Sequence, residues 1–271
     1  MNRIRDTFEK LRKRGEKALV AYVTAGDPNL DVTGQILLRI ARAGVDLMEI
    51  GIPFSDPTAD GPVIQGACQR ALASGTTLEG VFALLRKLRG QLDVPLVLFT
   101  YYNPILTYGL ERFVEEASRC GLDGILVVDL PLEEWEELRC YTDRAGLDFI
   151  TLVAPTTGPH RLSLILRRAT GFVYCISSMA VTGTIGPSLE EISGQIDHIR
   201  KLTDLPIAIG FGISKPEQAR AVGGLADGVV VGSAIVRAIE NYGGQGDVSE
   251  KVASLVWRFK QAIRGSDGPL G

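Results

Sequence analysis

Short apolar runs alternate with longer amphipathic segments along this chain. The apolar runs cover residues 19–24, 45–50, 95–100, 124–128, 149–153, 171–176, 206–209 and 228–231. Between them, apolar residues recur at three- and four-residue spacing, as in segments 30–43, 110–120, 132–145, 189–202 and 216–222. Continuous apolar runs are typical of parallel strands covered on both faces, and the wider spacing is typical of helices. Eight such units predict a closed (β/α)8 (TIM) barrel instead of an open doubly wound sheet.

Additional helices are expected around this barrel. We predict an extra N-terminal helix over residues 1–13, extra helical material within residues 55–88 after the second strand, and an extra C-terminal helix over residues 248–264. No linker or change in composition interrupts the repeat, so residues 1–265 are expected to form one domain. Residues 266–271 are expected to form a disordered tail.

Composition narrows the class of protein further. The chain has 271 residues, 45% hydrophobic and 23% charged, with a net charge of -3 at pH 7, and such a charge predicts no nucleic-acid partner. No apolar run approaches the roughly 18 residues of a membrane span, so no membrane association is expected. The four cysteines are widely spaced and form no C-x-x-C pair, which fits a reduced, cytoplasmic setting. The two histidines lie away from the predicted strand ends, so no metal site is expected.

Two carboxylates frame the loop after the second predicted strand. Glu49 stands at the end of the apolar run, and Asp60 follows at the end of the sequence G-I-P-F-S-D-P-T-A-D. A buried unpaired charge is costly, so a glutamate in such a strand indicates a function. Catalytic groups of (β/α)8 barrels lie at the C-terminal ends of strands. Partial burial would raise the pKa of Glu49 and suit it to general acid and base catalysis near neutral pH.

Glycine-rich turns follow the seventh and eighth predicted strands. They contain Gly210 and Gly212 in the first turn and Gly232 and Ser233 in the second. Barrels of this class bind phosphate at these two turns, and a helix beginning at Ser233 would point amide N–H groups at an anion. No P-loop motif is present, which favours a phosphomonoester over a nucleotide. A third loop, residues 177–186, is long and bounded by glycine, and it can close over a ligand and exclude water.

Several motifs, taken in chain order, resemble those of the α subunit of tryptophan synthase. They are Y-V-T-A-G-D-P at 22–28, E-I-G-I-P-F-S-D-P-T-A-D-G-P-V-I-Q at 49–65, Y-N-P-I at 102–105, D-L-P at 129–131, V-T-G at 181–183 and G-F-G-I-S at 210–214. The resemblance extends over nearly the whole chain, and the motif at 49–65 is the most specific part of it.

The resemblance implies a carbon-carbon lyase of tryptophan biosynthesis, with no cofactor on this chain. Indole-3-glycerol phosphate would be cleaved by a retro-aldol reaction into indole and glyceraldehyde 3-phosphate. Glu49 would shuttle protons, and Asp60 would accept a hydrogen bond from the indole N–H, with Thr182 bonding to Asp60 when its loop closes. The backbone donors to phosphate would be Gly183, Gly212, Gly232 and Ser233. The walls of the indole slot would be Tyr22, Ile64, Phe99, Tyr174 and Phe211.

The resemblance also implies a protein partner. This β subunit uses pyridoxal phosphate to condense indole with serine, and it receives indole through a tunnel in an expected α2β2 heterotetramer. The docking residues would be Pro53, Asp56, Pro57, Asn103 and Pro131. Because Asp60 shares a loop with several of them, docking can order the catalytic loop by differential affinity for two states. The isolated chain is therefore expected to be a poor catalyst.

Other functions stay open on the sequence alone. A stand-alone lyase of the same fold would release free indole. A non-catalytic activator of the β subunit is disfavoured by the presence of both Glu49 and Asp60. A different phosphate-binding barrel, such as a phosphosugar isomerase, is disfavoured by the motif at 49–65. One departure from the family is Ala180, which replaces the usual glycine before V-T-G and bears on how loop 177–186 closes.

Overall fold

The computed structural model describes residues 2–176, 188–210 and 212–264. Within these ranges, nine strands form one sheet with only parallel pairs. Their order in the sheet is β5-β4-β3-β2-β1-β9-β8-β7-β6. Neighbouring strands in the sheet are therefore consecutive in the chain, apart from the pair of β1 and β9. The strands are β1 Ala18–Thr24, β2 Leu47–Gly51, β3 Leu96–Thr100, β4 Gly124–Val127, β5 Asp148–Phe149, β6 Thr151–Val153, β7 Val173–Ile176, β8 Ile207–Gly210 and β9 Gly228–Val231.

The fifth predicted strand is divided in two at Ile150. β5 pairs with β4 on one side, whereas β6 pairs with β7 on the other. The Ile150 amide still donates to the Ile125 carbonyl at 2.9 Å, and the chain then turns to its second neighbour. The two outer strands of the sheet are therefore consecutive in the chain, and the sheet forms a nearly closed barrel. The eight predicted strands appear as nine for this reason, and the (β/α)8 barrel is confirmed.

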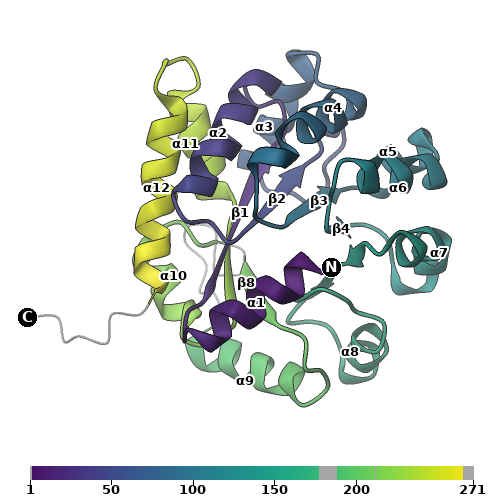
Figure 1. Ribbon diagram of the computed structural model, residues 1–271. Helices are drawn as coiled ribbons and strands as arrows, with labels where there is room; N and C mark the ends of the chain where they lie inside the picture. The colour runs from purple at the N-terminus through teal and green to yellow at the C-terminus, as the bar shows by residue number, and fades with distance from the viewer. Residues whose placement is uncertain (1, 177–187, 211, 265–271) are drawn as a thin grey trace, which may run out of the picture.

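Helices surround the strands (Figure 1). The extra N-terminal helix is α1, the insertion after β2 contains α3 and α4, and the extra C-terminal helix is α12. The predicted tail lies outside the described residues. The helices are α1 Arg3–Lys13, α2 Leu30–Arg42, α3 Pro62–Ala73, α4 Leu78–Leu88, α5 Tyr102–Tyr108, α6 Leu110–Arg119, α7 Trp135–Ala145, α8 Pro159–Leu166, α9 Leu189–Arg200, α10 Pro216–Gly223, α11 Ser233–Tyr242 and α12 Val248–Ile263, with short 3-10 turns η1 Arg89–Gln91 and η2 Leu132–Glu134.

Alternate residues along the strands contribute to two separate apolar cores. On β1, Leu19, Ala21 and Val23 pack with the surrounding helices, whereas Val20 belongs to a second cluster. This second cluster fills the barrel interior with side chains from most of the strands, among them Leu47, Val97, Leu126, Tyr174, Ala208 and Val230. The period of two along each strand thus directs one set of side chains inward and the other outward.

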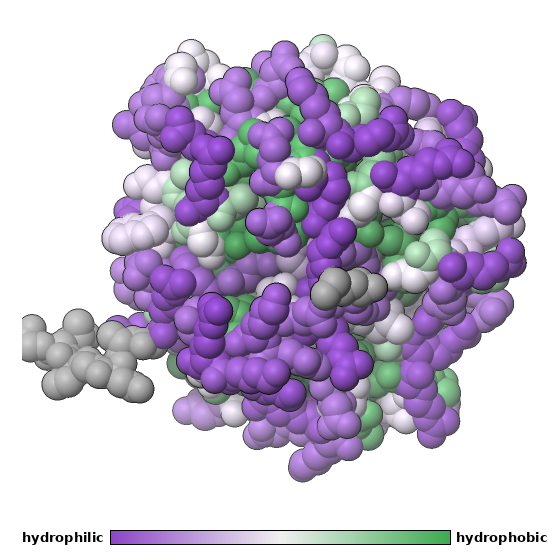
Figure 2. All heavy atoms as spheres, in the orientation of Figure 1, coloured by the Kyte–Doolittle hydropathy of each residue, from purple (hydrophilic) through white to green (hydrophobic). Residues whose placement is uncertain are grey.

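Helix α1 closes the N-terminal end of the barrel. Ile4 and Phe8 belong to the interior cluster, and the rings of Phe8 and Phe172 lie 5.7 Å apart. Two strands begin with glycine, and the absence of a side chain there leaves room for Ile4 and Phe8. A Cβ at Gly228 would lie 3.3 Å from the Phe8 ring, and one at Gly124 would lie 3.3 Å from Ile4. Figure 1 shows α1 lying across the centre of the ring of helices. In the same view the surface is largely hydrophilic, and hydrophobic side chains appear in the furrows between helices (Figure 2).

We expect Phe8→Ala to destabilise the protein because it opens a cavity under the barrel. Phe8 is 5% exposed, and loss of such an aromatic side chain lowers the free energy of unfolding by about 3–5 kcal/mol. Urea unfolding measures the change. Leu189→Ala, at a leucine that is 46% exposed, is the control and should cost less than about 0.5 kcal/mol. Equal losses in the two variants would contradict the plugging role of α1.

Candidate active site

Glu49 is the third of the five residues of β2, Leu47–Gly51, and lies beside Tyr22 in the register of β1 and β2. The residue is 0% exposed, and neither carboxyl oxygen has a hydrogen-bond partner among the described residues. Burial raises the pKa of Glu49 to about 8, so the side chain is mainly protonated at neutral pH. A buried polar group without a partner costs about 1–3 kcal/mol. Because Glu49 also lines a cavity, a ligand in that cavity could be its partner.

Asp60 is held in place by its neighbours in space. The Tyr101 hydroxyl donates to Asp60 Oδ2 at 2.9 Å and accepts from the Ala59 amide at the same distance. Gln65 of α3 donates from Nε2 to the Asp60 carbonyl at 2.8 Å. Burial raises the pKa of Asp60, and the Tyr101 hydrogen bond opposes that rise. The two carboxyl groups thus differ: Glu49 has no fixed partner and gives or takes a proton readily, whereas Asp60 is an oriented acceptor.

Two tyrosines and a phenylalanine form flat apolar walls around the carboxyl groups. The rings of Tyr22 and Phe99 meet edge to face, with centroids 5.1 Å apart and planes at 79°. A Cβ at Gly51 of β2 would lie 2.1 Å from the Tyr22 hydroxyl, and one at Gly210 of β8 would lie 2.2 Å from the Tyr174 hydroxyl. Each tyrosine therefore crosses a glycine on the neighbouring strand. Burial, followed by nearby carboxyl groups, raises the pKa of both tyrosines, so their hydroxyls stay neutral.

One cavity of about 590 Å³ brings the described candidate residues together. Its volume is in the range that suits a small organic ligand. Three candidates, Thr182, Gly183 and Phe211, lie outside the described residues, as does loop 177–186. The candidates that line the cavity are Tyr22, Glu49, Asp60, Ile64, Phe99, Tyr174, Gly212, Gly232 and Ser233.

Positive groups gather at the α11 end of this cavity. Helix α11 begins at Ser233, and its first helical hydrogen bonds run from the amides of Ile235 and Val236 to the Gly232 carbonyl. The amides of Ser233 and Ala234 precede these bonds and stand at the positive end of the helix. Three cationic side chains that the sequence analysis did not identify also line the cavity: Arg237, Lys251 and Arg258. Lys251 and Arg258 lie two turns apart on α12 and Arg237 lies on α11, so only the packing of the two helices brings the three to one cavity.

The sequence analysis also did not identify Tyr101 as a partner of Asp60. The motif at 102–105 begins just after it, yet its contact with Asp60 spans 41 residues of chain. Asp129, which follows β4, accepts a hydrogen bond from the Tyr102 amide at 2.7 Å. Asp129 therefore holds the start of α5 and is not part of the cavity lining. No local sequence pattern identifies either contact.

The predicted docking residues differ in exposure. Asp56, Asn103 and Pro131 are exposed, and Pro57 is half-buried. Pro53 is buried within this chain, so its contribution to an outer surface is small.

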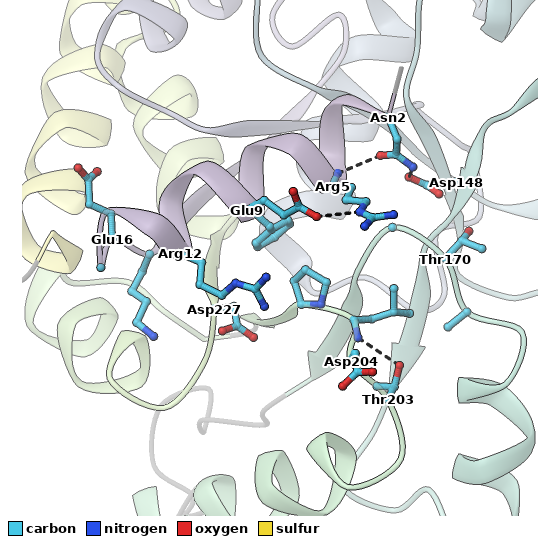
Figure 3. A pocket seen from close by; sticks show the side chains of 17 residues that line it. Asn2, Arg5, Glu9, Arg12, Glu16, Asp148, Thr170, Thr203, Asp204 and Asp227 are labelled. Atoms are coloured by element: carbon cyan, nitrogen blue, oxygen red, sulfur yellow. Dashed lines mark hydrogen bonds and ion pairs between the residues drawn. The ribbon is translucent and has the colours of Figure 1, made fainter.

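A second cavity, of about 640 Å³, lies at the other end of the barrel, between α1 and the segments that precede the strands (Figure 3). Its polar groups already bond one another. Asn2 donates to Asp148 at 2.9 Å, and Arg5 pairs with Glu9 at 2.8 Å. Groups at the N-terminal face of such barrels serve stability, and this cavity is not the candidate active site.

Two further findings concern only the ranges that the structure describes. Within them, no group of three or more His, Cys, Asp or Glu side chains is arranged to hold a metal ion. None of the described helices combines the length and the apolar character needed to cross a membrane.

The barrel, with two carboxyl groups that line one cavity at its mouth, has the architecture of a (β/α)8-barrel enzyme. A family model described as "Tryptophan synthase alpha chain" matches residues 8–264. The protein of that name from Geobacter sp. (strain M21) is 48% identical over 97% of this chain and 98% of its own, and that from Carboxydothermus hydrogenoformans is 49% identical over 97% and 99%. The crystal structure of tryptophan synthase subunit alpha from Legionella pneumophila superposes with a TM-score of 0.90 at 38% identity, over 97% of this chain and 98% of its own. The chain belongs to the tryptophan synthase alpha chain family.

Membership establishes the activity of this chain. The family catalyses the lyase half-reaction of tryptophan synthase, the cleavage of indole-3-glycerol phosphate. It works with a β-subunit partner, on which the pyridoxal phosphate resides. The function that the sequence analysis expected is therefore confirmed.

We expect Glu49→Gln to change how stability depends on pH. Between pH 4.5, the ordinary pKa of a glutamate, and about 8, folded Glu49 keeps its proton while the unfolded chain loses it. The free energy of unfolding of the wild type therefore falls as pH rises through this window, by a total on the order of 4 kcal/mol. Glutamine does not titrate, so the variant should gain on the wild type as pH increases. Urea unfolding at pH 5 to 8.5 measures the gap, and parallel curves would contradict the raised pKa.

Proposed function

We propose that the 590 Å³ cavity is where this chain cleaves indole-3-glycerol phosphate. The observation that carries the proposal is Glu49, buried, without a partner among the described residues and with its pKa raised to about 8. It lines the same cavity as Asp60 and the start of α11. The apolar walls of the cavity suit an indole ring, and the carboxyl groups suit a short hydroxylated chain. The positive end suits a phosphate.

Glu49 transfers the protons in the proposed reaction. In its protonated form it gives a proton to the indole ring carbon that bears the side chain. As a carboxylate it then takes the proton of the neighbouring side-chain hydroxyl. The carbon-oxygen double bond of glyceraldehyde 3-phosphate forms as the carbon-carbon bond breaks, and the bonding electrons return to the ring to give indole. A group whose pKa lies close to the working pH suits both transfers.

Asp60 stabilises the charge that develops on the ring. Protonation of the ring carbon makes the indole N–H more acidic, and a carboxylate that accepts from it lowers the energy of that state. The Tyr101 hydroxyl engages Asp60 Oδ2 and so orients the carboxylate before substrate binds. The proposed role of Thr182 on Asp60 concerns a residue outside the described ranges.

The remaining candidates bind the two ends of the substrate. Tyr22, Ile64, Phe99 and Tyr174 contact the indole ring, for which flat aromatic walls are suited; Phe211, outside the described ranges, completes this set. The amides of Gly212, Gly232 and Ser233, with that of Gly183 outside the described ranges, donate to phosphate. Arg237, Lys251 and Arg258 add positive charge at that end of the cavity, which raises the local concentration of an anionic substrate.

The proposed partner surface is connected to the site by hydrogen bonds. It includes Asp56, Pro57, Asn103 and Pro131, together with Pro53, in an α2β2 heterotetramer of the cytoplasm. Asp56 lies in the loop that contains Asp60, and Asn103 lies on α5, two residues after Tyr101. Because Tyr101 bonds both Ala59 and Asp60, docking on this surface bears on the orientation of Asp60 from both sides.

We expect Glu49→Gln to lower kcat about 10²–10⁴-fold, because it removes the general acid and base. Asp60→Asn should lower kcat about 10²-fold through loss of charge stabilisation. The kcat/KM of the wild type should fall above pH about 8, where the proton on Glu49 is lost. Steady-state cleavage of indole-3-glycerol phosphate from pH 6 to 9 measures all three effects. Retention of full activity by Glu49→Gln would remove Glu49 from the mechanism.

We expect a β subunit to accelerate cleavage by this chain. The isolated chain should turn over slowly, because the loop that bears Asp60 is mostly exposed over residues 55–59 and can change its conformation. A purified β subunit should raise kcat about 10-fold or more, a coupling of 1–3 kcal/mol being typical of allosteric effects. Assays with and without the partner test this. Fast cleavage that the partner does not change would instead indicate a stand-alone lyase that releases indole.

A further inference from the structure

Arg70 on α3 joins three elements of the barrel mouth through one guanidinium group. Its Nε and Nη2 atoms donate to the two carboxylate oxygens of Asp27, at 2.8 and 2.9 Å. Its Nη1 atom donates to Glu240 of α11 at 2.9 Å. Asp27 belongs to the loop after β1, so the loop, α3 and α11 meet at this side chain. Arg70 is outside the set of residues that line the cavity.

The Asp27 end of this contact is buried and fixed from several sides. The Asp27 side chain is 1% exposed, whereas Arg70 is 32% exposed. The neighbouring Gly26 accepts a hydrogen bond from Ser74 at its carbonyl, at 3.2 Å, and donates its amide to Thr33 at 2.9 Å. The loop after β1 is therefore a rigid support against which Arg70 can fix α3.

The helices that Arg70 connects carry opposite ends of the candidate active site. Helix α3 begins at Pro62, two residues after Asp60, and its Ile64 lines the cavity. Helix α11 begins at Ser233, at the positive end of the same cavity. Between them, Ile64 packs in a small cluster with Val236 of α11. Apolar packing alone permits sliding, whereas a bidentate ion pair fixes direction as well as distance.

We propose that Arg70 is a positioning residue that sets the separation between the carboxylate end and the anion-binding end of the cavity. The inference rests on the proposed function, since it concerns a ligand that must reach both ends at once. Arginine is required because its planar fork engages both oxygens of Asp27 while the third nitrogen reaches α11. Lysine offers one cationic point and cannot hold all three elements. A ligand that occupies one end only does not depend on the separation.

Equilibrium binding of three ligands to the full chain tests the proposal without turnover. The spanning ligand is an indole-3-alkyl phosphate that lacks the side-chain hydroxyl groups and cannot be cleaved. The two half-ligands are indole and glycerol 3-phosphate. Arg70→Met should weaken binding of the spanning ligand about 10-fold or more, which corresponds to the loss of one hydrogen bond between ligand and protein. Each half-ligand should change less than about twofold.

Further variants keep the test decisive if Arg70→Met folds poorly. Glu240→Gln removes only the negative charge of the α11 contact at the rim, where Glu240 is 47% exposed, and it should reproduce the selective loss to a smaller degree. Arg70→Lys should recover part of the binding. The matched control is Arg39→Met, which breaks the exposed pair of Arg39 with Glu250 at 3.1 Å and should leave all three affinities unchanged.

The outcomes separate the two levels of the argument. A wild-type chain that does not bind the spanning ligand overturns the proposed function, and the role of Arg70 with it. A second outcome is that the wild type binds the spanning ligand, but Arg70→Met and Glu240→Gln weaken binding of all three ligands equally. The contact then serves only the stability of the fold, and the positioning role alone is overturned. An unchanged affinity for the spanning ligand in both variants overturns it as well.

Discussion

The burial of the Glu49 carboxyl group at the mouth of the barrel is the constraint on which the rest of the site depends. A glutamate carboxyl group in water ionises near pH 4.5, and burial away from water raises the pKa of Glu49 to about 8. Such burial requires neighbouring strands that exclude water, side chains that pack around the group and no mobile donor that could pair with it. The parallel barrel provides the first condition, and the interior core with the Tyr22 and Phe99 rings provides the second. The energetic cost of the unpaired group is offset by packing elsewhere in the same barrel.

That packing is concentrated away from the reaction. Helix α1 inserts Ile4 and Phe8 into the N-terminal end of the barrel, and Lys260 of α12 is fastened there by an ion pair of 2.6 Å with Asp46, just before β2. The opposite end carries partly buried loops, the carboxyl groups and the start of α11. Stability and chemistry thus occupy opposite ends of the strands, as in other barrels of this architecture. A buried Glu49 without a hydrogen-bond partner among the described residues is tolerated at one end because the other end is closely packed.

The sequence predicts the parts that depend on short-range pattern. Apolar runs and helical spacing locate the strands and most helices, and the position of Glu49 at a strand end indicates its use. The division of the fifth strand at Ile150 was not predicted. It arises because the first part of the strand pairs with β4 and the second part with β7, and a run of apolar residues does not indicate such a change of partner. The Tyr101–Asp60 and Arg70–Asp27 contacts were likewise not predicted. They join residues 41 and 43 positions apart, and no local pattern indicates which distant side chain Asp60 or Asp27 contacts.

Two kinds of contact therefore place the groups of the candidate site. The first kind lies within the strands of the barrel, whose register fixes the position of Glu49 on β2. Those made between elements, such as Tyr101 with Asp60 or Arg70 with Asp27 and Glu240, depend on how loops and helices sit on the barrel. The second kind can respond to a partner or a ligand, since a small displacement of α5 or α11 alters a hydrogen bond, whereas no such displacement changes the register of β1 and β2. In this barrel the proposed proton-transfer group is fixed by the fold, and the groups proposed to orient the substrate's ring nitrogen and phosphate are the ones that binding can adjust.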